Sequence, residues 1–159
     1  MANSIYLTLK GMKQGLISAG CSSFESLGNK YQSAHQDQIF VYSFNHSLMR
    51  EQNANHLPAE FIKPMDKSSP LLGLALSENE ELYLLFDFYR TASEGLQQKF
   101  YSIELRGASL KQVSVNYPHS LTHADSQPEE LVVVAYKDIR WTHHIAGTDA
   151  YSFWSDRVF

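Results

Sequence analysis

Two adjacent histidines near the end of the chain are the first residues that could do chemistry. The stretch RWTHHIAGTDAYSFW, residues 140–154, places His143 and His144 two residues after Trp141 and ahead of Gly147. Imidazole nitrogens can bind a metal ion or transfer protons near neutral pH. Successive side chains of a strand point to opposite faces, so both histidines reach one ion only if the backbone turns between them. We therefore predict a strand running into a glycine turn, and no metal site.

The other histidines show no better catalytic pattern. His119 and His123 are four residues apart, but they follow Pro118 and are predicted to lie in a loop, not on one helix face. The sequence contains no HExxH, GxSxG or phosphate-binding loop motif. We predict no catalytic residue and no cofactor, while a hydrolase that uses the histidine-rich loops stays open as an alternative.

The paired carboxylates and the single cysteine are also predicted to have structural roles. The pairs Glu80-Glu81 and Glu129-Glu130 stand at predicted strand starts beside turns, so we expect solvated edges and not an acid–base pair. Cys21 lies among small residues in SAGCSS, where it is expected to pack as a small apolar side chain. A single cysteine cannot form an intramolecular disulfide.

Composition indicates a globular protein without nucleic-acid or membrane partners. Of 159 residues, 43% are apolar and 19% charged, so residues 1–159 are expected to form one domain with its own core. The net charge is −4 without a basic cluster, which argues against binding a phosphate backbone. We see neither a membrane-spanning apolar run nor the pattern of a cleavable signal peptide, so synthesis in the cytoplasm is expected.

Period-2 alternation predicts that most of the chain forms β-strands. One face of residues 82–89 carries only Leu and Phe, and the segments 5–9, 39–44 and 99–106 alternate in the same way. A tight hairpin is expected at Gly107, followed by a strand up to Tyr117. A last long strand over 129–143 is expected to place one set of side chains on a single face: Val133, Ala135, Ile139, Trp141 and His143.

One helix and two long loops interrupt the strands. In DKSSPLLGLALSEN, Ser69 is the predicted N-cap and Pro70 the first helical residue. The apolar stripe of this helix is expected to consist of Leu71, Leu72, Ala75 and Leu76. Residues 45–58 and 117–130 show neither helical nor strand periodicity and are predicted to be loops. These elements favour an antiparallel sandwich or barrel, either a self-assembling subunit or a monomeric ligand-binding β-sandwich.

Several blocks of sequence resemble one bacterial family. They are MANSIYLTLKGMKQGLISAGCS, FNHSLMREQN, EFIKPMDKSSPLL, FDFYR, VNYPHS, WTHHIAGT and YSFW, and they cover nearly the whole chain. In this order they resemble the Hcp (haemolysin-coregulated protein) family of the type VI secretion system. The resemblance implies an antiparallel two-sheet β-barrel with one flanking α-helix, similar to phage tail-tube proteins. Some members of the family carry a C-terminal toxin domain, and residues 1–159 are expected to leave no room for such an extension.

The resemblance also implies an assembly and its partners. Six copies would form a ring, and stacked rings would form the inner tube, which a contractile sheath propels with a spike protein from a baseplate. The subunit would be exported from the cytoplasm to the medium or a target cell, and small effectors could occupy the lumen.

By position, residues 45–58 resemble the family's extended loop that reaches toward an adjacent ring. The expected ring-stacking residues are Leu48, Met49, Arg50, Glu51, Gln52 and Asn53. Further expected assembly residues are Gly95, Trp141, His143 and Trp154, and Tyr151 to Trp154 should pack on the barrel or on a neighbour.

Overall fold

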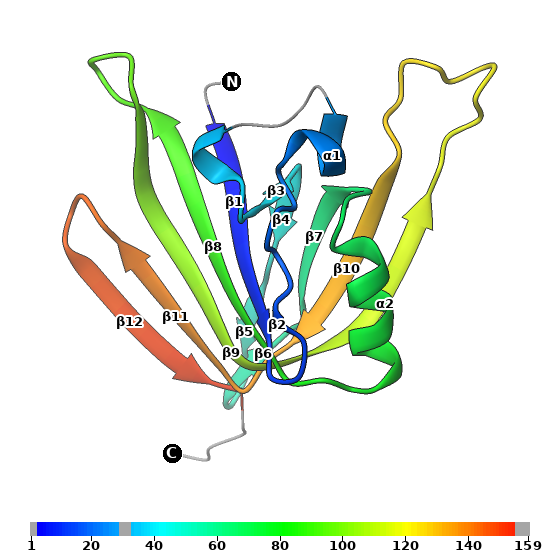
Figure 1. The fold of residues 1–159 in the computed structure, drawn as a ribbon. Helices are drawn as coiled ribbons and strands as arrows, with labels where there is room; N and C mark the ends of the chain where they lie inside the picture. The colour runs from blue at the N-terminus through cyan, green and yellow to red at the C-terminus, as the bar shows by residue number, and fades with distance from the viewer. Residues whose placement is uncertain (1–2, 29–32, 155–159) are drawn as a thin grey trace.

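The computed structural model describes residues 3–28 and 33–154, which form a mainly β, antiparallel fold with few helices (Figure 1). In chain order the elements are β1 (Asn3–Gly11), β2 (Gly15–Leu16), α1 (Phe24–Leu27), the 3₁₀ turn η2 (Ser33–His35), β3 (Ile39–Val41), β4 (Ser43–Asn45), β5 (Leu48–Arg50), β6 (Ala54–His56), β7 (Ala59–Pro64), α2 (Ser69–Ser77), β8 (Leu82–Thr91), β9 (Gln97–Asn116), β10 (Glu129–Ala135), β11 (Asp138–His143) and β12 (Thr148–Phe153).

The longest strand, β9, joins the two halves of the fold because each half of the strand has different partners. Its first half pairs with β8 and β11, and its second half pairs with β10. The order in the sheet is β2-β1-β8-β9-β10-β7-β4, with β11 and β12 beside the first half of β9. Figure 1 shows β9 crossing the base of the molecule and rising on both sides. The two halves of the sheet therefore share one strand.

The predicted hairpin at Gly107 is wrong, because the chain continues through this residue within β9. Gly107 has a φ of +58°, a conformation that residues with a Cβ rarely adopt. A Cβ at this position would also lie 2.6 Å from Cδ of Lys137, whose side chain crosses the glycine. The backbone amide of Lys137 donates to the carbonyl of Arg106 at 2.9 Å. Gly107 thus bends the strand where it changes partners and does not reverse it.

The alternation along the central strands is confirmed by burial. Leu9, Leu84 and Leu105 are register neighbours on β1, β8 and β9, and all three are fully buried. Phe86 of β8 is also fully buried, and its ring packs 5.2 Å from that of Phe61 on β7. Full burial of such a side chain contributes about 1.5–3 kcal/mol. The aromatic contact shows that both halves of the sheet enclose one core.

The predicted single strand over 129–143 is wrong in two respects. It is broken between β10 and β11, and the buried side chains of β10 are Glu130, Val132 and Val134, while Val133 and Ala135 are half-buried. A register shift falls between Val133 and Val134. Beyond the break Ile139 is buried as predicted. The residues between the two strands change the phase of the alternation, so one pattern cannot describe both.

The predicted helix is present as α2, with a different cap and a narrower buried face. Ser68 is the N-cap, and the hydroxyl of Ser69 accepts a hydrogen bond from the amide of Asp66. Leu72 and Ala75 are buried, whereas Leu76 is exposed against expectation. The short helix α1 was not predicted. In the described part of the chain neither helix is long and apolar enough to cross a membrane.

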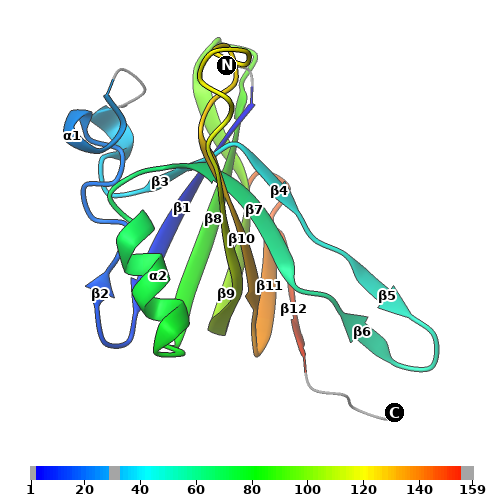
Figure 2. The ribbon, with the colours of Figure 1, turned by 90° about the vertical axis from the view of Figure 1, so that its right-hand side faces the viewer.

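Residues 45–58, called the arm below, were predicted to be an irregular loop but contain a β-hairpin. Strands β5 and β6 pair antiparallel in a small sheet of their own. The short strands escaped prediction because their pairing is local and few of their side chains are buried. Figure 2 shows the arm extending away from the main sheet.

Candidate functional site

Strand β5 of the arm presents apolar side chains to solvent. Leu48 and Met49 are 44% and 57% exposed, and the neighbouring Arg50, Glu51 and Gln52 are also exposed. Only Asn53 of the predicted stacking set is half-buried. Met49, Glu51, Gln52, Asn53 and Asn55 line a shallow depression of about 260 Å³. The structure therefore brings the predicted set together on one protruding hairpin whose exposed surface mixes apolar and charged groups.

The base of the arm is held by a cluster of aromatic and imidazole rings. His46 Nε2 and His56 Nδ1 each lie 2.8 Å from the hydroxyl of Tyr136, and His56 Nε2 lies 2.9 Å from the hydroxyl of Ser152. The Trp154 ring packs edge-on against Tyr136 at 4.8 Å and stacks on His56 at 5.8 Å. Two ends of the arm thus contact the junction between β10 and β11 and the end of β12.

Burial changes the proton affinity of this cluster. Burial, followed by the proximity of His56, lowers the pKa of His46, although a backbone hydrogen bond at Leu57 opposes the shift. Burial also lowers the pKa of His56, against a backbone hydrogen bond at Phe153. The pKa of the Tyr136 hydroxyl is raised by burial. All three rings are therefore neutral at neutral pH.

The paired histidines separate as predicted. His143 Nδ1 accepts a hydrogen bond from the amide of Ala146 at 3.0 Å, and Gly147 makes the turn with a φ of +73°. His144 lies on the other side, where its Nε2 is 2.7 Å from the hydroxyl of Ser102. Trp141 packs partly against the core from the same strand face as Ile139. This segment is a hairpin with a histidine-capped turn.

A serine, a histidine and an aspartate do meet beside this turn, but in the wrong order for hydrolysis. Ser102 donates its hydroxyl proton to Asp87 Oδ1 at 2.8 Å, so it accepts from His144 Nε2. A nucleophilic serine must instead donate to the histidine, which lies between serine and aspartate. These three residues therefore form a structural hydrogen-bond chain. Among the described residues no group of histidine, cysteine and acidic side chains is placed to hold a metal ion.

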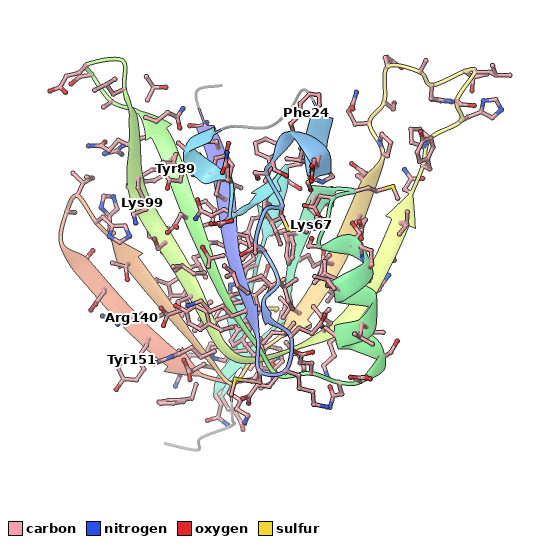
Figure 3. The ribbon with its side chains drawn as sticks, in the orientation of Figure 1. Phe24, Lys67, Tyr89, Lys99, Arg140 and Tyr151 are labelled. Carbon is pink, nitrogen blue, oxygen red and sulfur yellow. The ribbon has the colours of Figure 1, made fainter. Side chains whose placement is uncertain are left out.

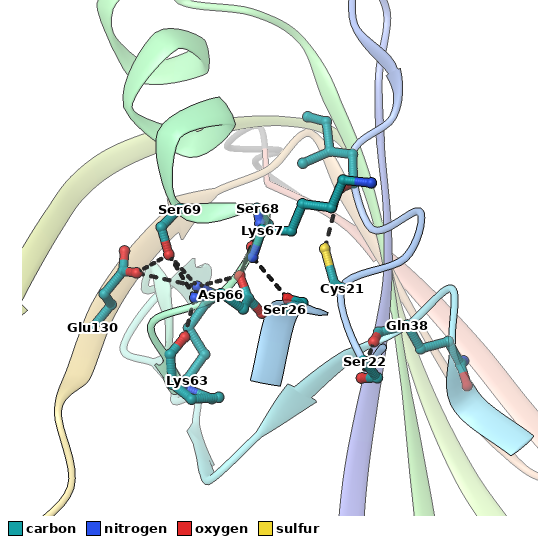
Figure 4. A network of polar contacts seen from close by, with 12 residues as sticks. Cys21, Ser22, Ser26, Gln38, Lys63, Asp66, Lys67, Ser68, Ser69 and Glu130 are labelled. Atoms are coloured by element: carbon teal, nitrogen blue, oxygen red, sulfur yellow. Dashed lines mark hydrogen bonds and ion pairs between the residues drawn. The ribbon is translucent and has the colours of Figure 1, made fainter. Parts of the chain in front are cut away.

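The carboxylate pairs were expected at solvated edges, and for two of the four residues that expectation is wrong. Glu130 is 1% exposed and lies with Lys63, Asp66 and Ser69 in a buried polar cluster between β7, β10 and α2 (Figure 4). Glu80 is 2% exposed. Burial acts to raise the pKa of Glu80. The backbone amides of Lys13 and Gln14 and the side chain of Gln14 donate hydrogen bonds to its carboxylate, and together they hold the pKa below its usual value.

Cys21 has the structural role that its neighbours predicted. It is fully buried, and burial, with a smaller effect of Asp66, raises the pKa of its thiol to about 12. A protonated and inaccessible thiol is not a nucleophile.

The edges of the sheet offer a second kind of surface. Within the described residues, β12 pairs with β11 and with no other strand, so it is an edge strand of the sheet. Tyr151 on this edge strand is 64% exposed and Phe153 is 43% exposed, and Figure 3 shows Tyr151 beside Arg140 on this hairpin. Tyr151 and Phe153 do not pack on the core, whereas Trp154 does. Gly95 lies in the turn between β8 and β9 with a φ of +81° and open space around it.

Comparison with known proteins assigns the chain to a family. The model of the family described as "Type VI secretion system effector, Hcp" matches residues 6–143. The chain belongs to the Hcp family. This confirms the resemblance seen in the sequence.

Individual relatives agree with the assignment. The chain is 34% identical to the "Major exported protein" of Pseudomonas aeruginosa, over 99% of both proteins. It is 38% identical to the "Uncharacterized protein YhhZ" of Escherichia coli, where the match covers 94% of this chain but 37% of that longer protein. The chain therefore spans about a third of the length of this relative.

Solved structures show the same fold. The secreted protein Hcp3 from Pseudomonas aeruginosa has a TM-score of 0.88 at 35% identity, covering 97% of this chain and 99% of that one. A crystal structure described as Hcp protein has a TM-score of 0.91 at 28% identity, with coverage of 97% and 99%.

Proposed function

We propose that this Hcp chain is a non-enzymatic structural subunit of the type VI secretion system, in which six copies form a ring and rings stack into the inner tube. The observation that carries the proposal is the family match over residues 6–143. The similarity to a secreted Hcp3 along almost the whole of both chains supports it. The chain would act as one Hcp-like domain, be exported after assembly in the cytoplasm, and carry small effectors in the ring lumen.

The proposed subunit is a two-sheet β-barrel. β3 pairs with β1, β4 pairs with β7, and Tyr42 alone separates the two short strands in the chain. The amide of Tyr42 also donates to the carbonyl of Ile62 at 2.7 Å. Residues 39–45 would therefore close the sheet by joining its first half to its second.

Stacking contacts are proposed to come from the arm. A head-to-tail contact between identical copies needs two different surfaces on opposite ends of each copy. Figures 1 and 2 show the arm toward one end of the molecule and the turn between β8 and β9, which contains Gly95, toward the other. Residues 48–53 would reach the adjacent ring, with the Gly95 turn as a candidate receiving surface.

Ring contacts are proposed to involve the hairpin of β11 and β12. The edge strand β12 and the exposed rings of Tyr151 and Phe153 would be covered by a neighbouring subunit. Trp141, His143 and Trp154 would support this surface by fixing the hairpin. The assembled tube would then contact the sheath, the spike protein and the baseplate, and neither nucleic acid nor membrane insertion forms part of the proposal.

The proposal is tested by the mass and shape of the purified protein. Six copies of 18.1 kDa give about 109 kDa, so light scattering after size exclusion should show this mass, and negative-stain images should show rings. A protein that stays at the mass of one chain at every concentration would overturn the proposal.

A further inference from the structure

Three side chains from distant parts of the chain meet at one oxygen atom at the base of the arm. His46 precedes β5, His56 ends β6, and Tyr136 lies between β10 and β11. Both imidazoles approach the Tyr136 hydroxyl at 2.8 Å, and His56 and Tyr136 are each 4% exposed. The arm has few other anchors, since most of the side chains of β5 and β6 are exposed. This meeting point is therefore a main anchor of the arm, together with the contacts of His56 to Ser152 and Trp154.

The hydrogen-bond donors and acceptors around the Tyr136 hydroxyl match two neutral imidazoles. Tyr136 has one hydroxyl proton, so it can donate to one histidine and must accept from the other. A neutral imidazole offers one donor and one acceptor nitrogen, which allows both 2.8 Å contacts to be hydrogen bonds. The second nitrogen of His56 is used by Ser152 on β12. In this state every proton has an acceptor.

Two protonated imidazoles cannot keep this arrangement. Both nitrogens that face Tyr136 would then carry protons, so the hydroxyl proton would lose its acceptor. Two positive charges would also face each other across a single oxygen atom, at a site largely removed from water. Burying charge without a partner is strongly unfavourable.

Among residues 3–28 and 33–154, no carboxylate forms an ion pair with either histidine that would offset this cost. Apart from the other imidazole, the described groups that contact the two histidines are all neutral. They are the side chains of Tyr136, Ser152 and Trp154 and the backbone of Leu57 and Phe153. The charged residues that follow Tyr136 are engaged elsewhere, Lys137 with Glu81 and Asp138 with Arg106.

We propose that His46, His56 and Tyr136 form an acid-released latch, which fixes the arm at neutral pH and frees it when both imidazoles are protonated. The consequence for assembly rests on the proposed function, because a freed arm would no longer hold stacked rings together. Mild acid would therefore separate stacked rings while leaving the subunit folded.

The direction follows from the two pKa shifts. Burial lowers the pKa of both histidines in the latched state below the ordinary value of 6.5. The released arm then takes up protons first as the pH falls below 6.5, so release becomes more favourable there. The equilibrium constant for release of the arm rises by at most about tenfold per pH unit for each histidine, or about a hundredfold for the two together.

The latch is tested by measuring the distance between the arm and β12 with spin labels at Gln52→Cys and Thr148→Cys, both exposed positions. Labelled chains are diluted with unlabelled chains so that only distances within one subunit are recorded. We expect a narrow distance distribution above pH 6.5 and a broad one about one unit below it, while circular dichroism shows a folded chain at both. A distribution that stays narrow at the lower pH overturns the proposal.

Variants separate the latch from other effects of acid. Tyr136→Phe keeps the ring against Trp154 but removes the hydroxyl, so the distribution should be broad at both pH values. His46→Gln with His56→Asn replaces each nitrogen that faces Tyr136 by an amide that does not titrate, and should keep the distribution narrow at both pH values. The exposed His123→Gln is the matched control and should behave like the parent chain. Acid release that persists in the double variant overturns the proposal.

Scattering from the same samples separates the two proposals. Tubes that form but do not dissociate in acid contradict the latch and leave the proposed function standing. Arms that release in acid in a protein that never forms rings support the latch and contradict the proposed function.

Discussion

The ammonium group of Lys63 lies 3.3 Å from the carboxylate of Glu130, and both side chains are at most 1% exposed. Asp66 Oδ1 lies 3.0 Å from the same ammonium group, and the carbonyl of Pro64 accepts from it at 2.9 Å. One cation thus pairs with two acidic groups, one at the start of β10 and one before α2. This pairing fixes the helix against the sheet.

Replacing Lys63 by Met should therefore be strongly destabilising. It leaves two carboxylates buried without their partner, and breaking a buried ion pair costs about 3–5 kcal/mol. Denaturant unfolding measures the loss. Lys137→Met is the matched control, because the Lys137–Glu81 pair is exposed and its loss should cost less than about 1 kcal/mol. Equal losses in the two variants would contradict the role given to the buried cluster.

Two glycine-to-alanine changes should have opposite effects. At Gly107 a Cβ would need a strained φ and would collide with the Lys137 side chain, so Gly107→Ala should cost about 1–3 kcal/mol. At Gly73 in α2 a Cβ meets open space, and Gly73→Ala should stabilise by about 0.5–1 kcal/mol. Thermal unfolding measures the stability of both variants. An unchanged stability of Gly107→Ala would show that β9 is not bent by this glycine.

Removing the exposed apolar side chains of β5 should prevent stacking without preventing ring formation. Leu48→Ser with Met49→Ser takes exposed apolar side chains from the proposed contact, so rings should remain while tubes disappear in negative-stain images. Leu121→Ser is the control, because Leu121 is 87% exposed in a loop outside the arm. Unchanged tubes in the arm variant would exclude residues 48 and 49 as stacking contacts.

Changing both paired histidines should weaken the rings. His143→Ala with His144→Ala removes the cap of the turn and the hydrogen bond to Ser102, which hold the β11–β12 hairpin in place. We expect a larger fraction of single subunits in size exclusion at low concentration. Rings and tubes of unchanged stability would end the assembly role proposed for this hairpin.

Tube formation should depend on salt. Six copies at −4 each give about −24 per ring, so stacked rings repel unless opposite charges meet at the contact. Salt screens exposed charges beyond about 10 Å at 0.1 M, so stacking followed by light scattering should change between low and moderate salt. Stacking that is the same at both salt concentrations would rule out this electrostatic contribution.

The sequence predicted the features that depend on local pattern. Alternation along 82–89 identified the buried face with Leu84 and Phe86, and Pro70 located the start of the helix within a residue. Strand geometry also predicted that His143 and His144 would separate. Each of these features involves residues only a few positions apart, so the period of a strand or a helix is enough to predict it.

Features that depend on distant partners were missed. The side chain of Lys137 fills the space beside Gly107, and the buried Glu130 pairs with Lys63. The meeting of His46 with Tyr136 joins residues 90 positions apart, and histidines in a polar loop give no indication of that partner. The break between β10 and β11 could have been suspected, since Tyr136-Lys137 interrupts the run of valines.

Because both halves of the sheet share β9, the two halves should unfold together. Opening the half built on β10 removes the partner that holds the far end of β9, and opening the half built on β8 does the same at the near end. Neither half retains a complete core alone, because the Phe61 and Phe86 rings come from different halves. The subunit should therefore melt in one cooperative transition, with no long-lived half-folded species exposing its strands to aggregation.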